Sequence, residues 1–310
     1  MRFERSNSDA LRRVFMPELP EVETIVRTLR PAVIGRRITA AEVRVPKSAG
    51  RLAPSGGLLN ISAEQFAQRV AGTRIERVER YGKHIVIHLD REPSPSRTVN
   101  GRIILLIHLG MTGRLTCESV AEFARKHTHM VLALDEPGRW LHYCDIRRFG
   151  RIRLIKNPGD ALGKLGPDPL EISSEEFVER LHSRRMMLKS LLLNQSFLRG
   201  LGNIYADESL FRAGIHPAAI AARLSRKRAL RLHQSIRETL CEAIEQGGSS
   251  ISDYVDATGQ PGFFQINHQV YQRTGEACLR CGGATGSKSR KIIVAGRSTH
   301  FCARCQRKAG

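Results

Sequence analysis

The chain has 310 residues, which is long enough for two domains with a buried core each. Its 50 Lys and Arg residues outnumber 30 Asp and Glu residues, and the resulting formal charge of +20, with an isoelectric point near 10.5, is typical of a protein that binds phosphates. Hydrophobic residues make up 41% of the chain, which argues against a ribosomal or histone-like protein without a globular core, and no stretch approaches the roughly 20 apolar residues of a membrane span.

The first 15 residues show no clear period and lack the apolar run of a secretory signal. We predict that residues 1–15 are a leader absent from the mature protein and that translation starts at Met16; the alternative is a genuine, retained extension. A chain trimmed of Met16 begins at Pro17 and carries a free secondary amine. Such an amine titrates at about 7.7–8, so a usable fraction is nucleophilic near neutral pH.

Residues 16–23 read M-P-E-L-P-E-V-E. An amine that attacks a sugar or carbonyl carbon forms a Schiff base, and Glu18 places a carboxyl group beside Pro17 as an acid–base partner. The same stretch also suits an ordinary helix start, with Pro20 in the first turn and apolar residues at helical spacing up to a stop at Gly35. The two interpretations are compatible, and this stretch alone favours the structural one.

Short aliphatic or β-branched runs follow Gly35, several of them alternating in polarity and all separated by loops, which predicts a β-sandwich. Two loops in this region, 47–60 and 91–101, are rich in Pro, Gly and Ser and suggest no chemistry. The predicted strands are 37–45, 73–80, 84–89, 102–109, 128–134, 139–146 and 150–155.

Residues 158–170 contain several Pro and Gly residues and indicate a linker to a helical region. A capping box of Ser173 with Glu176 begins that region, and a long amphipathic helix follows Ser225. Between them lies G-L-G-N-I-Y-A-D-E-S at 200–209, where Asn203 is placed to cap a helix whose first N–H groups face a phosphate. A G-x-G-N stretch also makes a plain loop.

Four cysteines near the end have the spacing of a structural zinc site: Cys278-x2-Cys281 and Cys302-x2-Cys305, 20 residues apart. A pair of disulfides is the alternative, disfavoured by the lack of a secretion signal. Between the two pairs a hairpin about Ala295-Gly296 is predicted to present Arg297 at its tip. The other cysteines, Cys117, Cys144 and Cys241, are predicted to be buried thiols.

With these motifs in the same order, residues 16–310 resemble the bacterial formamidopyrimidine-DNA glycosylase family (8-oxoguanine DNA glycosylase and AP lyase). The resemblance implies an α+β multidomain fold: an N-terminal β-sandwich with a leading helix, a helix-two-turn-helix domain, and a zinc-finger hairpin. The implied boundaries are 16–157 for the catalytic sandwich, 158–170 for the linker, 171–268 for the helix-two-turn-helix domain and 269–310 for the zinc finger.

The family's catalytic positions match four residues. The resemblance implies that the Pro17 nitrogen attacks C1′ of a flipped nucleotide while Glu18 moves the proton that opens the sugar. Lys83 then contacts the phosphates around the damaged nucleotide, and Arg297 assists the second strand cut. The one Zn²⁺, held by the four cysteines, is structural. Taken singly, a lysine at a strand start and an arginine on a zinc ribbon are ordinary surface groups.

Further positions match family contacts to DNA. Met111, Arg147 and Phe149 match a wedge that fills the space left by the everted base, which offsets the few kcal/mol that unstacking costs. Without the resemblance, Met111 reads as core filler. The other matching DNA contacts are His127, Arg184 and Asn203.

The resemblance therefore predicts a monomeric base-excision-repair enzyme. Its substrate is double-stranded DNA with oxidised bases or abasic sites, and its expected location is the bacterial cytoplasm, at the nucleoid. Two alternatives stay open. An endonuclease VIII-like glycosylase acts on oxidised pyrimidines, but that branch usually begins P-E-G-P-E and here Leu19 stands at the third position. A catalytically inactive DNA-binding relative is the other, and an intact leader favours it.

Overall fold

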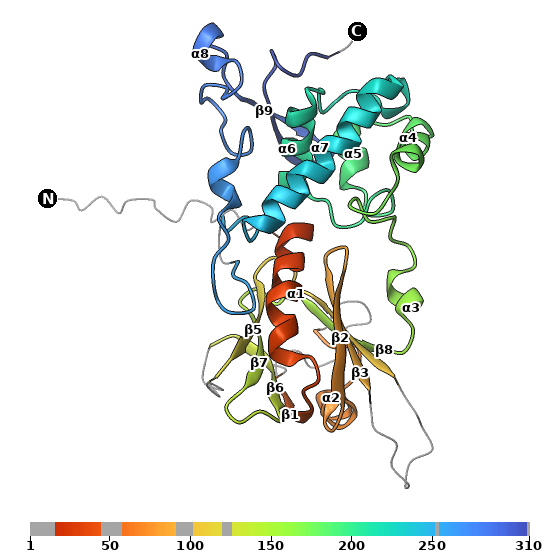
Figure 1. The fold of residues 1–310 in the computed structure, drawn as a ribbon, viewed down its shortest axis with the longest axis vertical. Helices are drawn as coiled ribbons and strands as arrows, with labels where there is room; N and C mark the ends of the chain where they lie inside the picture. Colours follow the sequence, from red (N-terminus) through yellow and green to blue (C-terminus); the bar gives the residue numbers. More distant parts are fainter. Residues whose placement is uncertain (1–15, 45–57, 91–101, 120–125, 252–253, 309–310) are drawn as a thin grey trace, which may run out of the picture.

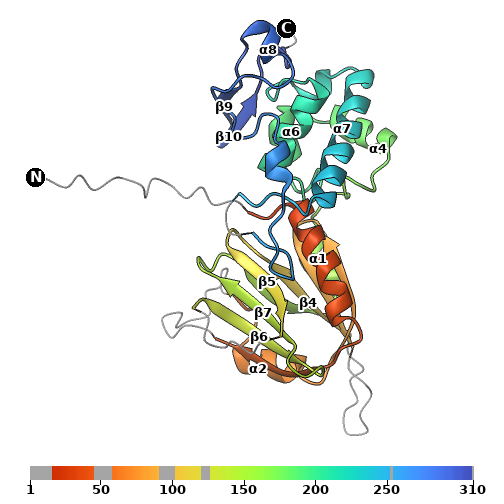
Figure 2. The same ribbon diagram turned by 60° about the vertical axis from the view of Figure 1, so that its left-hand side comes forward.

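The computed structural model describes residues 16–44, 58–90, 102–119, 126–251 and 254–308. The predicted leader 1–15, the loop 91–101 and most of the loop 47–60 lie outside them. Figures 1 and 2 show a strand-rich lobe and a helical lobe, with helix α1 (Leu19–Val33) reaching from one to the other. The predicted combination of sandwich, helical domain and zinc-finger hairpin is confirmed.

Helix α1 belongs to two cores at once. Its first residue, Leu19, is buried in the core of the helical lobe, whereas Val22 and Ile25 are buried in the core of the sandwich. The backbone N–H of Leu19 donates to the Gly200 carbonyl at 3.0 Å. The helix ends where expected, because Gly35 takes a φ of +81° that a residue with a Cβ adopts at a cost. The start of α1 is thus fixed against the helical lobe.

The sandwich consists of two four-stranded antiparallel sheets. Seven of the eight strands were predicted; the missed one is β5, whose sequence Gly-Arg-Leu-Thr-Cys-Glu carries too few aliphatic residues to be recognised. Helix α2 (Ala63–Val70) was also missed. One sheet is β1 (Ile38–Val43), β6 (Thr128–Leu134), β7 (Trp140–Asp145) and β5 (Gly113–Glu118); the other is β2 (Arg74–Tyr81), β3 (His84–Asp90), β4 (Ile103–His108) and β8 (Arg151–Ile155).

The helical lobe packs its elements around the long helix α7 (Arg226–Glu245), which Ser225 precedes as predicted. The Ser173 hydroxyl accepts a hydrogen bond from the Glu176 N–H at 3.1 Å, which is one half of the predicted capping box. The other elements of this half are α4 (Ser174–His182), α5 (Leu188–Leu193), α6 (Asn203–Ala213), η2 (Ala221–Arg223), η3 (Phe264–Asn267), α8 (Gly282–Thr285), and the hairpin β9 (Arg290–Val294) with β10 (Arg297–Phe301). The short helix α3 (Pro158–Leu162) packs on the sandwich instead, beside β8 (Figure 1).

Polar contacts hold the two lobes together. Arg80 at the end of β2 pairs with Glu23 of α1 at 2.9 Å and with Asp168 at 2.7 Å. Asp168 lies in the predicted linker yet is 2% exposed, so this segment is anchored as well as connecting. On the other side, the loop after α7 descends to the sandwich (Figure 2), where the Ala257 carbonyl accepts from the Cys117 N–H at 2.8 Å.

Among the helices of the described residues, none is long and apolar enough to cross a membrane.

The prediction that Cys117, Cys144 and Cys241 are buried is wrong: Cys241 is exposed and the other two are half-buried. Cys241 falls on the outer side of α7, because helical periodicity alone decides which face a residue takes.

Candidate active site

A cavity of about 590 Å³ lies where α1, the β2–β3 turn, the start of α6 and the β9–β10 hairpin meet. Its lining includes Met16, Glu18, Lys83, Asn203 and Arg297, drawn from widely separated parts of the chain. The fold thus brings the predicted catalytic side chains to one place beside Pro17, which is itself buried.

Glu18 occupies the N-terminal end of α6. Its carboxylate accepts hydrogen bonds from the backbone N–H groups of Ile204 at 3.0 Å and Tyr205 at 3.5 Å, and its side chain is 4% exposed. The unpaired N–H groups and partial positive charge of a helix start stabilise a carboxylate there. The first-turn N–H groups that the sequence assigned to a phosphate are therefore used to position Glu18.

Gly202 lets the two charged side chains approach this helix start. A Cβ at position 202 would lie 2.3 Å from Cδ of Glu18 and 2.6 Å from Nζ of Lys83, so any other residue displaces one of them. The prediction that Asn203 caps the helix is wrong, because Gly202 takes the N-cap position and Asn203 is the first helical residue. The Asn203 amide instead donates to the Ser298 carbonyl at 3.0 Å.

Burial shifts the pKa values of Glu18 and Lys83 in opposite directions. It raises the pKa of Glu18, an effect that the nearby Lys83 ammonium opposes. It lowers the pKa of Lys83, with Glu18 and Glu21 opposing and Arg297 adding to the shift. A carboxyl group with a raised pKa next to a desolvated amine is suited to accept and return a proton.

Glu21 is a functional candidate that the sequence did not reveal. It is 2% exposed, accepts from the backbone N–H groups of Glu18 and Ser249, both at 2.8 Å, and accepts from the Tyr205 hydroxyl. Burial and the adjacent Glu18 raise the pKa of Glu21 to about 7. An acid in the first turn of a helix is common, so the position of Glu21 in the sequence gives no sign that it is buried.

We expect Glu21 to make the protein less stable as pH rises. Its pKa rises from about 4.5 to about 7 on folding, so the folded state keeps a proton through this window that the unfolded state releases. The free energy of unfolding therefore falls between these pH values, by at most about 3 kcal/mol from this group. Urea unfolding at pH 5 and pH 8 should show a smaller fall in Glu21→Gln than in the native chain, since the pKa of Glu18 is raised in both proteins. The surface variant Glu64→Gln should show the native fall, and an equal fall in Glu21→Gln contradicts the assignment.

A buried ion pair connects α6 to the hairpin that carries Arg297. Lys189 and Asp207 are both fully buried, with Nζ 2.7 Å from Oδ1. The other oxygen of Asp207 accepts from the backbone N–H of His300 at 2.8 Å, and Lys189 also donates to the Asn203 carbonyl at 2.8 Å. His300 of β10 is thereby bonded to α6. Arg297, three residues earlier on the same strand, is held at the cavity. The sequence carried no signal for this pairing.

The predicted wedge forms a separate cluster on the sandwich, outside the lining of the cavity. The Arg147 guanidinium lies 4.7 Å from the centre of the Phe149 ring, and Phe149 is 46% exposed. A Cβ on Gly110 would lie 2.6 Å from the Phe149 carbonyl carbon, so the turn that carries Met111 packs directly against the 147–150 turn. The three residues are thus brought together at the surface.

Asp145, which the sequence did not single out, holds these turns. It is fully buried and accepts from the Thr112 hydroxyl, from the Gly150 N–H at 2.9 Å and from the Arg147 N–H at 3.2 Å. Its own N–H donates at 3.0 Å to the carbonyl of His127, which adopts a φ of +73°. His127 is therefore tied to the same cluster. Arg184 is exposed between α4 and α5 and does not line the cavity.

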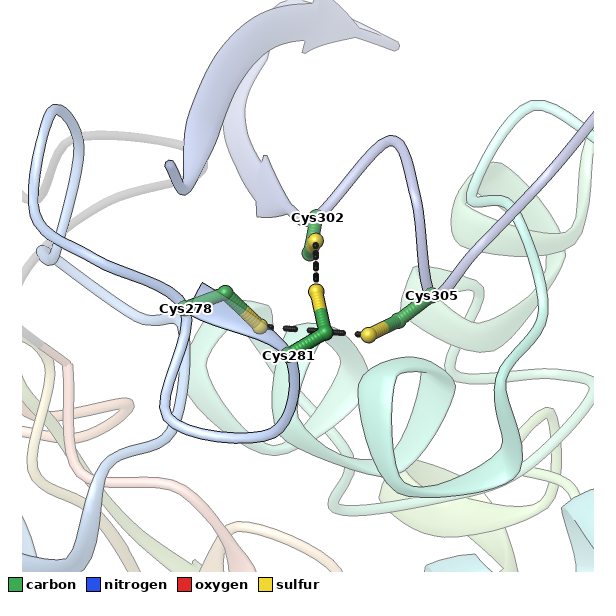
Figure 3. Close-up of side chains that lie close together, drawn as sticks. All are labelled: Cys278, Cys281, Cys302 and Cys305. Atoms are coloured by element: carbon green, nitrogen blue, oxygen red, sulfur yellow. Dashed lines mark hydrogen bonds between the residues drawn. The ribbon is translucent and has the colours of Figure 1, made fainter. Parts of the chain in front are cut away.

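The four predicted metal ligands form a compact group (Figure 3). Their sulfur atoms all lie within 4.8 Å of one another, with 3.9 Å between Cys278 and Cys305 and 3.6 Å between Cys281 and Cys302. A tetrahedron with Zn–S bonds of 2.3 Å has edges of about 3.8 Å, and a disulfide is far shorter. The donors therefore fit one structural zinc with no open coordination position.

We expect one zinc ion per chain, and its removal should release the hairpin. Binding of a structural zinc contributes on the order of 10 kcal/mol to folding of such modules. Metal analysis of Cys281→Ser should find the zinc lost, and limited proteolysis should cut within 275–308. Cys241→Ser, at an exposed position on α7, is the matched control and should keep the metal. A Cys281→Ser chain that retains zinc and resists protease contradicts the assignment.

Three family profiles match consecutive parts of the chain. The formamidopyrimidine-DNA glycosylase N-terminal domain matches residues 16–152, and the formamidopyrimidine-DNA glycosylase H2TH domain matches 165–255. The zinc finger found in FPG and IleRS matches 275–307, which includes all four cysteines. Together they cover the sandwich, the helical lobe and the metal site.

Curated relatives and solved structures resemble the chain over nearly its whole length. A formamidopyrimidine-DNA glycosylase of Solibacter usitatus is 48% identical over 293 residues, and one of Bacillus subtilis is 40% identical over 300; each alignment covers 94% of this chain and 100% of the relative. The Lactococcus lactis Fpg, solved with abasic-site DNA, is 34% identical with a TM-score of 0.79, covering 94% of this chain and 100% of that one. A mutant of the same Lactococcus lactis protein, solved with Fapy-dG DNA, is also 34% identical and has a TM-score of 0.80.

Proposed function

The chain belongs to the formamidopyrimidine-DNA glycosylase family, and we propose that it removes oxidised purines from double-stranded DNA and cuts the strand at the resulting abasic site. The observation that carries the proposal is the cavity beside Pro17, where Glu18, Lys83 and Arg297 converge from separate segments. A catalytic centre of this kind requires a nucleophile, an acid–base group and cations for phosphates within one pocket. Zn²⁺ is its structural metal.

In the proposed reaction the Pro17 amine is the nucleophile. Its lone pair bonds to C1′ of the damaged nucleotide as the bond between C1′ and the base breaks. The base leaves with the electrons of that bond and takes up a proton, and the proline nitrogen loses its own proton. Glu18 transfers a proton to the sugar ring oxygen as the ring opens, which leaves an iminium between Pro17 and C1′. Successive β- and δ-eliminations then break the phosphodiester bonds on both sides, and water releases the amine.

The remaining predicted residues are proposed to hold the DNA. Lys83 and Arg297 face the cavity and offer charge to the phosphates beside the reacting sugar, and Arg297 assists the second elimination. Asn203 also lines the cavity. The wedge of Met111, Arg147 and Phe149 fills the gap left by the everted base. The outlying contacts are proposed for His127 and Arg184, which lie further along the surface.

The domain division proposed is 16–157, 158–170, 171–268 and 269–310. It is supported by the separate cores of the sandwich and the helical lobe, and by a further cluster in which the four cysteines pack with Val270 and with Phe211 of α6. We propose that the enzyme acts as a monomer on chromosomal DNA in the bacterial cytoplasm, since its substrate is found at the nucleoid.

A lesion panel tests the proposal. Chain beginning at Pro17 is incubated with duplexes that carry 8-oxoguanine, a formamidopyrimidine, an oxidised pyrimidine or no lesion, and base release and strand cutting are measured separately. We expect release and cutting on the two purine lesions. Preferential release of the oxidised pyrimidine supports the endonuclease VIII-like alternative instead, and tight binding with no release supports an inactive relative.

A further inference from the structure

A row of basic side chains crosses the sheet next to the cavity. His84 on β3 pairs with His108 on β4, and His108 pairs with Arg151 on β8. Paired residues in adjacent strands point to the same face of a sheet, so these three lie side by side. Arg153, two residues further along β8, points to the same face.

These residues line a second, smaller cavity of about 130 Å³. Its lining is completed by Leu106 from the sheet and Ala161 from α3, which covers the adjoining apolar part of this face. His84 and His108 also belong to the lining of the larger cavity, so the two spaces are adjacent across the histidine pair. The volume suits a group as small as a phosphate.

The charges in this row are not balanced by acids. None of the ion pairs among the described residues includes His84, His108, Arg151 or Arg153. Basic groups directly opposite one another across strands repel when charged. In keeping with this, the pKa of His84 is lowered to about 4 by burial and by Arg153, and that of His108 to about 3 by burial and by its basic neighbours.

The histidine orientation leaves a donor for a ligand. Nδ1 of His108 accepts a hydrogen bond from the backbone N–H of Gly110 at 3.2 Å, so the ring proton lies on Nε2. Arg151 donates one N–H to the Gly150 carbonyl at 3.1 Å and keeps its other N–H groups for further partners. Neutral imidazoles and guanidinium groups that share one small cavity are suited to bind a single anion.

We propose that His84, His108, Arg151 and Arg153 form a subsite for one backbone phosphate of the damaged DNA strand, next along that strand from the phosphates at the catalytic cavity. The proposal rests on the proposed function, because that function supplies the DNA. Because His84 and His108 line both cavities, this phosphate lies within a few nucleotides of the lesion. The subsite extends the grip on the strand that is cut and takes no part in the chemistry.

Binding to a duplex with a tetrahydrofuran abasic analogue tests the subsite. The double variant Arg151→Gln/Arg153→Gln is compared with the native chain and with Arg102→Gln, whose residue precedes β4 at the opposite end, about 20 Å from His108. We expect the double variant to bind about tenfold more weakly, and the slope of log affinity against log salt to fall by about 0.9 for the lost phosphate. Arg102→Gln should match the native chain.

A scan of neutral linkages identifies the phosphate. Each phosphate within three positions of the analogue is replaced in turn by a methylphosphonate. One replacement should weaken the native chain and leave the double variant unchanged, because the two changes remove the same contact. If every replacement weakens both proteins equally, or if the double variant keeps native affinity and slope, the subsite is disproved.

Borohydride trapping on a natural abasic site separates this failure from failure of the proposed function, with every protein in these tests beginning at Pro17. A native chain that traps DNA without any coupled phosphate keeps its function and loses the subsite. A native chain that neither binds nor traps lesion DNA loses both.

Discussion

Protein that begins at Pro17 should become covalently attached to abasic-site DNA in the presence of borohydride, and protein that retains residues 1–16 should give no adduct. In the retained form the Pro17 nitrogen is part of a peptide bond, and its lone pair is delocalised into the carbonyl. The imine step is then unavailable. Met16 itself lines the cavity and is 39% exposed, so a retained Met16 occupies space where a sugar must approach.

Gel separation of the trapped complex, with intact mass of each protein preparation, measures this difference. We expect protein that retains residues 1–16 to form no adduct at all, since covalent catalysis needs the free amine. Both preparations should bind the tetrahydrofuran duplex and contain zinc, which controls for folding. Full activity of a chain whose mass includes residues 1–16 would falsify the assignment of Pro17 as nucleophile.

Replacement of Glu18 by Gln should abolish base release with little effect on DNA affinity. In the native protein the Ile204 N–H donates to Oε1 of Glu18 at 3.0 Å. The side-chain carbonyl of Gln can accept the same hydrogen bond, so the start of α1 should keep its position. Proton transfer is lost, and we expect the single-turnover rate on 8-oxoguanine DNA to fall by about 10²–10⁴-fold. Lys83 also loses the neighbouring carboxylate that favours its charged form.

Rapid-quench measurements on Glu18→Gln separate chemistry from binding. Glu64→Gln, an acid in the first turn of α2 and far from the cavity, should release base at the native rate. The pre-formed abasic site offers a second control, since the glycosidic bond is already broken there. If Glu18→Gln releases oxidised guanine at a rate within roughly threefold of native, the activation barrier has changed by less than about 1 kcal/mol. That result excludes Glu18 from the proton transfer.

Local sequence was sufficient for features whose physics is local. The start of α1 follows from proline and acidic residues at a helix N-terminus, and its end follows from Gly35. The sandwich strands follow from alternation over a few residues, and the zinc site follows from two C-x2-C pairs that need only a hairpin to meet. Where the pattern is weak, as in β5, the same reasoning missed the strand.

The resemblance to a family assigned the catalytic positions in order, and the fold brought Glu18, Lys83, Asn203 and Arg297 into one cavity. What neither periodicity nor spacing contained is how those side chains are held. Glu21 looks like an exposed first-turn acid until residues from α6 and from the loop after α7 close over it. From the sequence, Lys189 resembles an ordinary lysine on a helix surface, but in the structure it forms a fully buried ion pair with Asp207.

Chain-local information therefore determined the elements, the metal ligands and the order of the motifs in this protein. Only the tertiary structure decided which polar groups are buried, which N–H groups point at Glu18, and why position 202 admits no side chain. The physical reason is that the desolvation of a side chain and its close contacts depend on atoms that are distant in sequence. The residues next to it along the chain do not determine which atoms those are.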